Sequence, residues 1–186
     1  IFAYESVARL IEKDGTATTA GRFIETIEKY GLGRHLDRII VRKVIETNKR
    51  TIDSQGEAKR LFINLSAQEI QGRGILGYAE ELCNQLEVPP SSIVFEILER
   101  DAIGDMSNMG KFLSNLRKKG FSFALDDFGS GYNSFHYLRE LHFEYVKIDG
   151  AFVRNLPNSK IDRALVRNLS RLCQELDILI IGEFVE

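Results

Sequence analysis

The 186-residue sequence is poor in several residue types that define common classes of protein. It has no tryptophan, two cysteines and three histidines, and its formal net charge is only −2. Two cysteines exclude a disulfide framework and favour a reducing compartment, and neither they nor the histidines have zinc-site spacing. The small net charge argues against nonspecific binding to nucleic acid or to an anionic membrane. We therefore expect a reduced globular protein that holds no zinc.

Long apolar runs are also missing. No stretch approaches the about 20 consecutive apolar residues that a transmembrane helix needs, and no signal peptide is visible. The length suits one domain with a sizeable core. Because the sequence begins at Ile1 rather than at a methionine, we expect a further segment upstream.

Short apolar runs alternate along the chain with longer segments of helical periodicity. The runs are nearly continuous, which is typical of parallel strands covered on both faces. We expect strands at Phe2–Val7, Leu61–Leu65, Ile93–Leu98, Phe121–Leu125, Tyr145–Ile148 and Ile178–Ile181. Strand followed by helix, repeated, indicates right-handed parallel crossovers. Two architectures then remain, an open doubly wound sheet and a closed (β/α) barrel.

Polar side chains recur in or just after these expected strands, and this favours the barrel. In a barrel the carboxyl ends of all strands meet at one mouth, where functional side chains gather. Charges inside apolar strands are costly unless they are paired or bind a metal, so unrelated ion pairs do not explain the recurrence. The residues are Glu5, Asn64, Glu96, Glu99, Asp126, Asp127, Lys147, Asp149, Glu183 and Glu186.

The stretch FALDDFGSGY at residues 123–132 is the clearest case. An apolar strand ends on Asp126 and Asp127, whose charges repel, and a glycine-rich turn follows that must approach a ligand or move. Carboxylate and amide oxygens suit Mg²⁺, Mn²⁺ or Ca²⁺ rather than zinc. Two adjacent aspartates can flank two cations, and a two-metal site activates water for a phosphoryl displacement. Lys147 would add positive charge to this acidic site.

These motifs resemble the EAL-domain family of cyclic di-GMP phosphodiesterases. ALDDFGSGYNS at 124–134 and VKID at 146–149 are specific to the family pattern, and FINLS at 62–66, FEILE at 95–99 and GEFVE at 182–186 fit it in series. YESVAR at 4–9 stands where the family has its Glu-Ala-Leu segment. The resemblance covers the whole chain and implies an α/β, TIM-barrel-like (β/α)8 fold. Residues 1–186 would be a single EAL-type domain, lacking the first strand and the last strand and helices.

The resemblance also implies roles for single residues. Lys147 matches a lysine near the attacking water, and Glu183 matches a glutamate at the metal and water site. Arg9 matches an arginine that contacts a ligand phosphate, and Glu99 matches a glutamate that anchors the loop after the aspartate pair. Asp149 and Glu186 fall on family positions with less defined roles. The implied metal ligands are Glu5, Asn64, Glu96, Asp126 and Asp127.

The activity implied by the resemblance is metal-dependent hydrolysis of cyclic di-GMP to linear pGpG, a reaction of bacterial second-messenger signalling. The implied cofactors are two Mg²⁺ or Mn²⁺ ions, and cyclic di-GMP is the implied ligand. A homodimer, upstream sensory or GGDEF-type domains and a cytoplasmic location, tethered or not to the inner membrane, are implied as well.

Departures from the family pattern keep a second function open. Ser6-Val7 replaces Ala-Leu near the expected guanine-facing wall, Leu98 replaces a threonine and Phe184 replaces a glycine. None removes a charged group. The alternative is a domain that binds cyclic di-GMP without cleaving it and signals through a partner.

A third interpretation sets the family aside. Carboxylates and a lysine at barrel strand ends also suit a Mg²⁺-dependent, proton-abstracting enzyme of the enolase kind. The adjacent aspartates and the lack of a second lysine two residues from Lys147 argue against it.

Overall fold

The computed structural model describes residues 2–66, 69, 74–103, 106–129, 138 and 140–185. These residues divide into two compact units. The first comprises Ile1–Phe95 and Asn115–Phe121, and the second comprises Glu96–Ser114 and Ser122–Glu186. Strand β5 (Ile93–Leu98) begins in the first unit and ends in the second.

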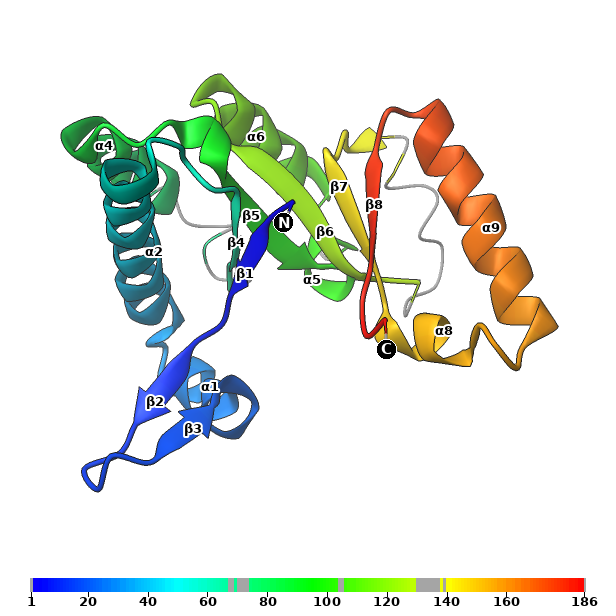
Figure 1. Ribbon diagram of the computed structural model, residues 1–186, viewed down its shortest axis with the longest axis horizontal. Helices are drawn as coiled ribbons and strands as arrows, with labels where there is room; N and C mark the ends of the chain where they lie inside the picture. The colour runs from blue at the N-terminus through cyan, green and yellow to red at the C-terminus, as the bar shows by residue number, and fades with distance from the viewer. Residues whose placement is uncertain are drawn as a thin grey trace. The chain divides into compact units, whose positions relative to one another are not determined.

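The first unit combines strands of the larger sheet with helices packed beside them (Figure 1). β1 (Tyr4–Ser6) pairs in parallel with β4 (Leu61–Asn64), and β5 follows β4 in the sheet. The aromatic and branched side chains of β4 and of the start of β5 are buried, as their preference for a packed sheet predicts. The helices are α1 (Ala20–Lys29), α2 (Gly33–Gln55) and α4 (Ile75–Leu86), with the 3-10 turn η1 at Pro90–Ser92.

Helices α2 and α4 lie side by side (Figure 1) and bury apolar stripes of both. Val41 and Ile45 of α2 are fully buried, as are Ile75 and Ala79 of α4. Their spacing of four residues places each pair on one helix face. Cys83 continues the α4 stripe, and burial raises the pKa of its thiol to about 11, so this cysteine packs as a small apolar side chain.

A buried asparagine joins α2 to the segment before β4. Asn48 is 1% exposed and donates from Nδ2 to the Lys59 carbonyl at 2.9 Å and to Ser92 Oγ at 2.9 Å. The Lys59 N–H in turn donates to Asn48 Oδ1 at 3.0 Å. These bonds give partners to the partly buried backbone groups of Lys59, so Asn48 fixes how the chain enters β4.

The second unit carries three strands, after the end of β5, in a parallel arrangement. β6 (Ser122–Phe128), β7 (Tyr145–Ile148) and β8 (Leu179–Gly182) follow in this order, with Lys147 opposite Ile181 in the register. Ser159 caps α9 by accepting a hydrogen bond from the Asp162 N–H at 3.1 Å. The helices are α5 (Glu99–Ile103), α6 (Met106–Lys118), which ends in the first unit, α8 (Gly150–Asn155) and α9 (Lys160–Glu175).

The strands predicted from the sequence agree with the structure in place, but two expectations are corrected. β6 runs on to Phe128, so Asp126 and Asp127 lie within the strand rather than after it. The expectation of strands covered on both faces holds for β4 to β7, whereas β1 and β8 have largely exposed side chains. β1 pairs only with β4 and β8 only with β7 among the described strands, so each is an edge strand with less to bury against.

A hairpin that the sequence analysis missed follows β1. β2 (Arg9–Ile11) and β3 (Ala17–Thr19) are antiparallel, and Gly15 has a positive φ of 86° in the turn between them. The Asp14 side chain accepts the Thr16 N–H at 2.9 Å. The Asp14-Gly15 pair is a hairpin signal that could have revealed this element.

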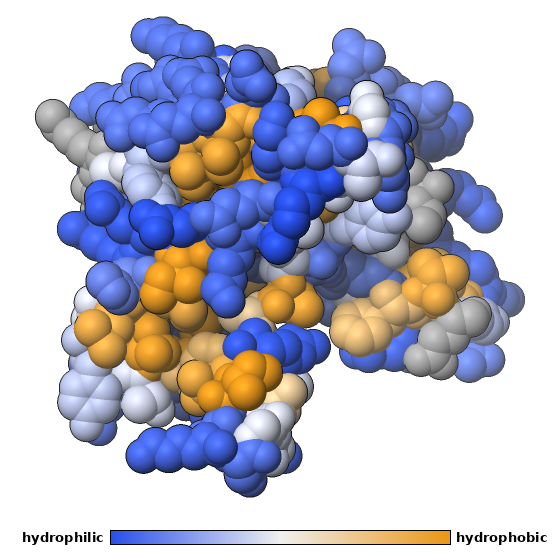
Figure 2. All heavy atoms as spheres, turned by 60° about the vertical axis from the view of Figure 1, so that its left-hand side comes forward, coloured by the Kyte–Doolittle hydropathy of each residue, from blue (hydrophilic) through white to orange (hydrophobic). Residues whose placement is uncertain are grey.

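Several large apolar side chains are exposed on the described surface. They include Ile11 of the hairpin and Phe2 before β1. Figure 2 shows one face of the molecule, on which hydrophobic side chains are interrupted by hydrophilic ones. In the part of the chain that the structure describes, none of the helices has both the length and the apolar character needed to cross a membrane.

Replacing the buried asparagine tests how the first unit is held together. We expect Asn48→Ala to lower the free energy of unfolding by about 2 kcal/mol, because it removes the hydrogen bonds to Lys59 and the buried bond to Ser92. Urea denaturation measures the change. Asn84→Ala, an exposed position on α4, is the matched control and should change stability little. Equal stability of the two variants would contradict this account of Asn48.

Candidate functional site

A buried lysine surrounded by carboxylates forms a charged cluster in the second unit. Lys147 lies on β7, and its side chain is only 5% exposed. Its Nζ lies 3.1 Å from Glu96 Oε1, 3.2 Å from Asp126 Oδ1 and 2.9 Å from Glu183 Oε1. The three carboxylates come from β5, from β6 and from the residue after β8. Four sequence-predicted site residues thus meet at one point.

A β-bulge in β6 brings the carboxylates of the adjacent Asp126 and Asp127 to the same side of the strand. Side chains alternate between faces along a regular strand, so neighbours point in opposite directions. The register between β6 and β7 shifts between Leu125 and Phe128, and Asp127 has a left-handed φ of 54°. Aspartate tolerates this conformation better than most residues. The bulge turns the second carboxylate back, and one oxygen each of Asp126, Asp127 and Glu183 lie within 4.8 Å of one another.

Carboxylates of four residues gather near the Lys147 ammonium in this cluster. The ammonium of Lys147 faces Glu96, Asp126 and Glu183, with Asp127 beside them. Burial, and then the charges of Asp126 and Asp149, raise the pKa of the Asp127 carboxyl. A cluster of oxygen ligands of this kind fits a hard divalent cation such as Mg²⁺ or Mn²⁺.

Two neighbouring carboxylates support the backbone around the cluster. Glu99 is buried at the start of α5, and its Oε2 accepts the Gly129 N–H at 2.9 Å, just after β6. Asp149 caps α8, because its Oδ1 accepts the Ala151 N–H at 2.7 Å. The sequence analysis left the role of Asp149 undefined, although an aspartate before a helical segment is a signal for a cap. Ser130 to Tyr132 of the glycine-rich turn and Glu186 lie outside the described residues.

The remaining predicted residues belong to the first unit. The parallel register of β1 and β4 brings the exposed Glu5 near Asn64, whose Nδ2 donates to Glu5 Oε1 at 3.3 Å. Arg9 begins β2, is exposed and donates from Nη1 to the Ala8 carbonyl at 2.9 Å. Their roles as metal ligands and as a phosphate contact stay predictions.

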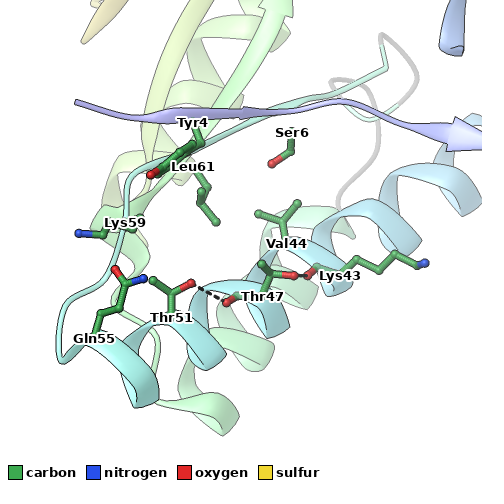
Figure 3. Close-up of a pocket in the computed structure, with 9 residues that line it drawn as sticks. All are labelled: Tyr4, Ser6, Lys43, Val44, Thr47, Thr51, Gln55, Lys59 and Leu61. Carbon is green, nitrogen blue, oxygen red and sulfur yellow. Dashed lines mark hydrogen bonds between the residues drawn. The ribbon is translucent and has the colours of Figure 1, made fainter. Parts of the chain in front are cut away.

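Ser6, which stands where the family pattern has alanine, lies beside helix α2. Ser6 lines a cavity of about 400 Å³ beside α2, together with Tyr4, Lys43 and Thr47. Figure 3 shows its side chain pointing toward Val44 of that helix. Because side chains alternate along a strand, Ser6 lies on the face opposite to Glu5. The effect of Ser6 on a guanine-facing wall near Glu5 stays a prediction, and Val7 follows the strand and is exposed.

The other two departures lie in the second unit. Leu98 is half-buried at the end of β5. Phe184 follows Glu183 and has a left-handed φ of 51°, a conformation that glycine adopts readily and bulky residues avoid.

Comparisons with known proteins agree with the motifs. A model of the EAL domain matches residues 1–186. The chain is 37% identical over 183 residues to the cyclic di-GMP phosphodiesterase PdeB of Shewanella oneidensis, and 27% identical over 181 residues to PdeA of Borreliella burgdorferi, also named a cyclic di-GMP phosphodiesterase. The matches cover 98% and 97% of this chain but 21% and 27% of these relatives. The chain thus spans about a quarter of their length.

Solved structures show the same architecture. The PaMucR phosphodiesterase in complex with c-di-GMP matches with a TM-score of 0.90 and 26% identity, over 98% of this chain and 74% of that one. The FimX EAL domain of Pseudomonas aeruginosa bound to c-di-GMP matches with a TM-score of 0.89 and 27% identity, over 98% and 72%. The predicted α/β, TIM-barrel-like fold class is confirmed. With a family model that matches from the first residue to the last, the chain belongs to the EAL domain family.

Proposed function

We propose that this EAL domain is a metal-dependent phosphodiesterase that hydrolyses one phosphodiester bond of cyclic di-GMP and releases linear pGpG. The relatives named above as cyclic di-GMP phosphodiesterases support the substrate class. The observation that carries the proposal is the cluster of Asp126, Asp127 and Glu183, whose oxygens lie within 4.8 Å of one another beside Lys147.

The residues of this cluster fit divalent cations. Asp126, Asp127, Glu183 and Glu96 supply carboxylate oxygens beside Lys147, and oxygen ligands of this kind favour hard, positively charged ions. Two Mg²⁺ or Mn²⁺ ions bound there would supply an activated water near neutral pH and offset the charge on the phosphate. We include Glu5 and Asn64 among the ligands on the basis of the family pattern.

The chain's own residues have separate tasks in this reaction. Lys147 Nζ, held at 2.9 Å from Glu183 and 3.2 Å from Asp126, offers donors to a water or to a phosphate oxygen. Glu183 would accept a proton from the attacking water. Water adds to phosphorus, the bond to one ribose oxygen breaks, and that oxygen leaves with a proton. Arg9 would bind a phosphate oxygen, and Glu99 would hold the backbone after β6.

The proposals on location, oligomeric state and further domains rest on the family pattern rather than on this cluster. We propose a cytoplasmic domain that acts as a homodimer and is joined to sensory or GGDEF-type domains upstream. The much greater length of the curated relatives is consistent with such additional domains.

The first prediction from the proposed function concerns catalytic activity. We expect the full-length protein to convert cyclic di-GMP to pGpG in the presence of Mn²⁺, as measured by chromatography of the nucleotides. Asp126→Asn should lower the rate by orders of magnitude, because it removes one ligand charge while leaving the size of the side chain unchanged. Asp53→Asn, at an exposed position on α2, is the matched control and should retain the wild-type rate.

Two outcomes would contradict this prediction. Absence of pGpG from protein that circular dichroism shows to be folded would reject catalysis. Tight binding of cyclic di-GMP in EDTA without turnover in Mn²⁺ would instead identify a binding module.

The second prediction concerns Lys147. In EDTA, we expect Lys147→Met to lower the free energy of unfolding by about 4 kcal/mol, because buried Glu96 and its neighbours lose the ammonium between them. Mn²⁺ should recover more stability in this variant than in the wild type, because the cation offsets the same carboxylates. Urea denaturation with and without Mn²⁺ measures both effects.

The control for Lys147 is a lysine in a more exposed pair. Lys119 pairs with Glu80, and their side chains are 29% and 35% exposed. Lys119→Met should cost less than about 1 kcal/mol and show no added gain from Mn²⁺. If the two lysine variants were equally stable in EDTA, the buried cluster would not depend on the Lys147 ammonium.

A further inference from the structure

Phe184 has a backbone conformation that bulky residues rarely adopt. Its φ of 51° lies in the left-handed region, where the Cβ of an L-residue crowds the following carbonyl oxygen. The family pattern has glycine here, and glycine adopts this conformation without that crowding. A bulky residue persists in such a conformation only where its surroundings compensate.

The compensation comes from α8. The edge of the Phe184 ring lies directly against the backbone of the buried Gly150. A Cβ added to Gly150 would lie 2.1 Å from Phe184 Cδ2 and 2.8 Å from Cε2, so only glycine leaves room for the ring. The guanidinium carbon of Arg154 lies 4.4 Å from the ring centroid, which is within cation–π range. Helix α8 thus contacts the ring through both Gly150 and Arg154, while Phe184 as a whole stays 58% exposed.

These contacts connect two segments that carry the charged cluster. Gly150 follows Asp149, the cap of α8, which lies two residues after Lys147 on β7. Phe184 follows Glu183, whose Oε1 lies 2.9 Å from Lys147 Nζ. The ring therefore ties the bend after β8 to the helix that continues β7.

We propose that Phe184 is a positioning residue for Glu183. Its ring contacts Gly150 and Arg154 of α8. These contacts fix the bend after β8 so that the Glu183 carboxylate lies beside Lys147. The consequence for catalysis rests on the proposed function, whereas the fixed bend itself does not. Side chains that orient a metal ligand through a second contact change metal affinity when they are removed.

Variants at both partners test the contact. We expect Phe184→Ala to weaken Mn²⁺ binding by about tenfold in isothermal titration calorimetry of the full-length protein, because the ring is lost and the left-handed backbone remains. Gly150→Ala should have a similar effect, because the new methyl group displaces the ring. Phe184→Tyr keeps the ring and should bind Mn²⁺ as the wild type does.

A double-mutant cycle separates this contact from general damage. Gly150→Ala should weaken Mn²⁺ binding in the wild type but have little further effect in a Phe184→Gly background, where no ring remains to be displaced. Gly77→Ala, at a helical glycine with open space around it, controls for the added methyl group. Phe2→Ala controls for the lost aromatic ring, because Phe2 is also 58% exposed and has Arg60 4.8 Å from its ring centroid. Both controls should bind Mn²⁺ as the wild type does.

Hydrogen exchange in the metal-free protein provides a measurement that does not depend on activity. Amides of residues 182–185 should exchange faster in Phe184→Ala and in Gly150→Ala than in the wild type or in either control. Unchanged exchange there, or equal effects of Gly150→Ala on Mn²⁺ binding in both backgrounds, would overturn the positioning role. If the wild type neither binds Mn²⁺ nor cleaves cyclic di-GMP, the proposed function fails, and the exchange rates alone decide whether Phe184 positions Glu183.

Discussion

The second unit depends on one buried ammonium group placed among several carboxylates. Lys147 supplies the fully buried Glu96 with a positive charge at 3.1 Å, and removing one partner of a buried ion pair costs several kcal/mol. The ammonium can reach Glu96, Asp126 and Glu183 together only if β5, β6, β7 and the end of β8 keep their places relative to one another. The supporting contacts, from the Asp149 cap to the bond between Glu99 and Gly129, preserve that geometry.

The same cluster is not optimised for stability. Asp127 has a raised pKa because it is partly buried near like charges, and both Asp127 and Phe184 are held in left-handed conformations. Unfavourable local features of this kind concentrate where a site must be ready for a ligand. A cation that binds the folded state alone would turn this local cost into a gain in stability that grows with cation concentration.

The sequence was informative where the signal is local and repeated. Continuous apolar runs identified the strands, and polar residues at their ends identified Glu96, Asp126, Lys147 and Glu183, which the fold brings together. The β-bulge at Asp127 escaped prediction because it depends on the register between β6 and β7, which no short stretch encodes. Likewise, the contact between Phe184 and Gly150 joins residues far apart in the chain, and only the folded structure reveals it.

Other misses have simpler causes. The Asp14-Gly15 turn was visible in the sequence, but its flanking strands are too short to show an apolar pattern. The exposure of β1 and β8 could not be predicted from their apolar residues, because burial depends on which neighbours each strand finds. The sequence alone does not show which face of β1 carries Ser6, because this depends on the contact that Glu5 makes with Asn64.

The bulge in β6 also determines how this site responds to changes in chain length. It holds one residue more than a regular strand would place between Leu125 and Phe128. Loss of a single codon in this stretch would restore strict alternation, so that β6 could still pair with β7 while only one aspartate faced Glu183. Such a shortening would remove an acidic group from the cluster while the pairing of β6 with β7 remained.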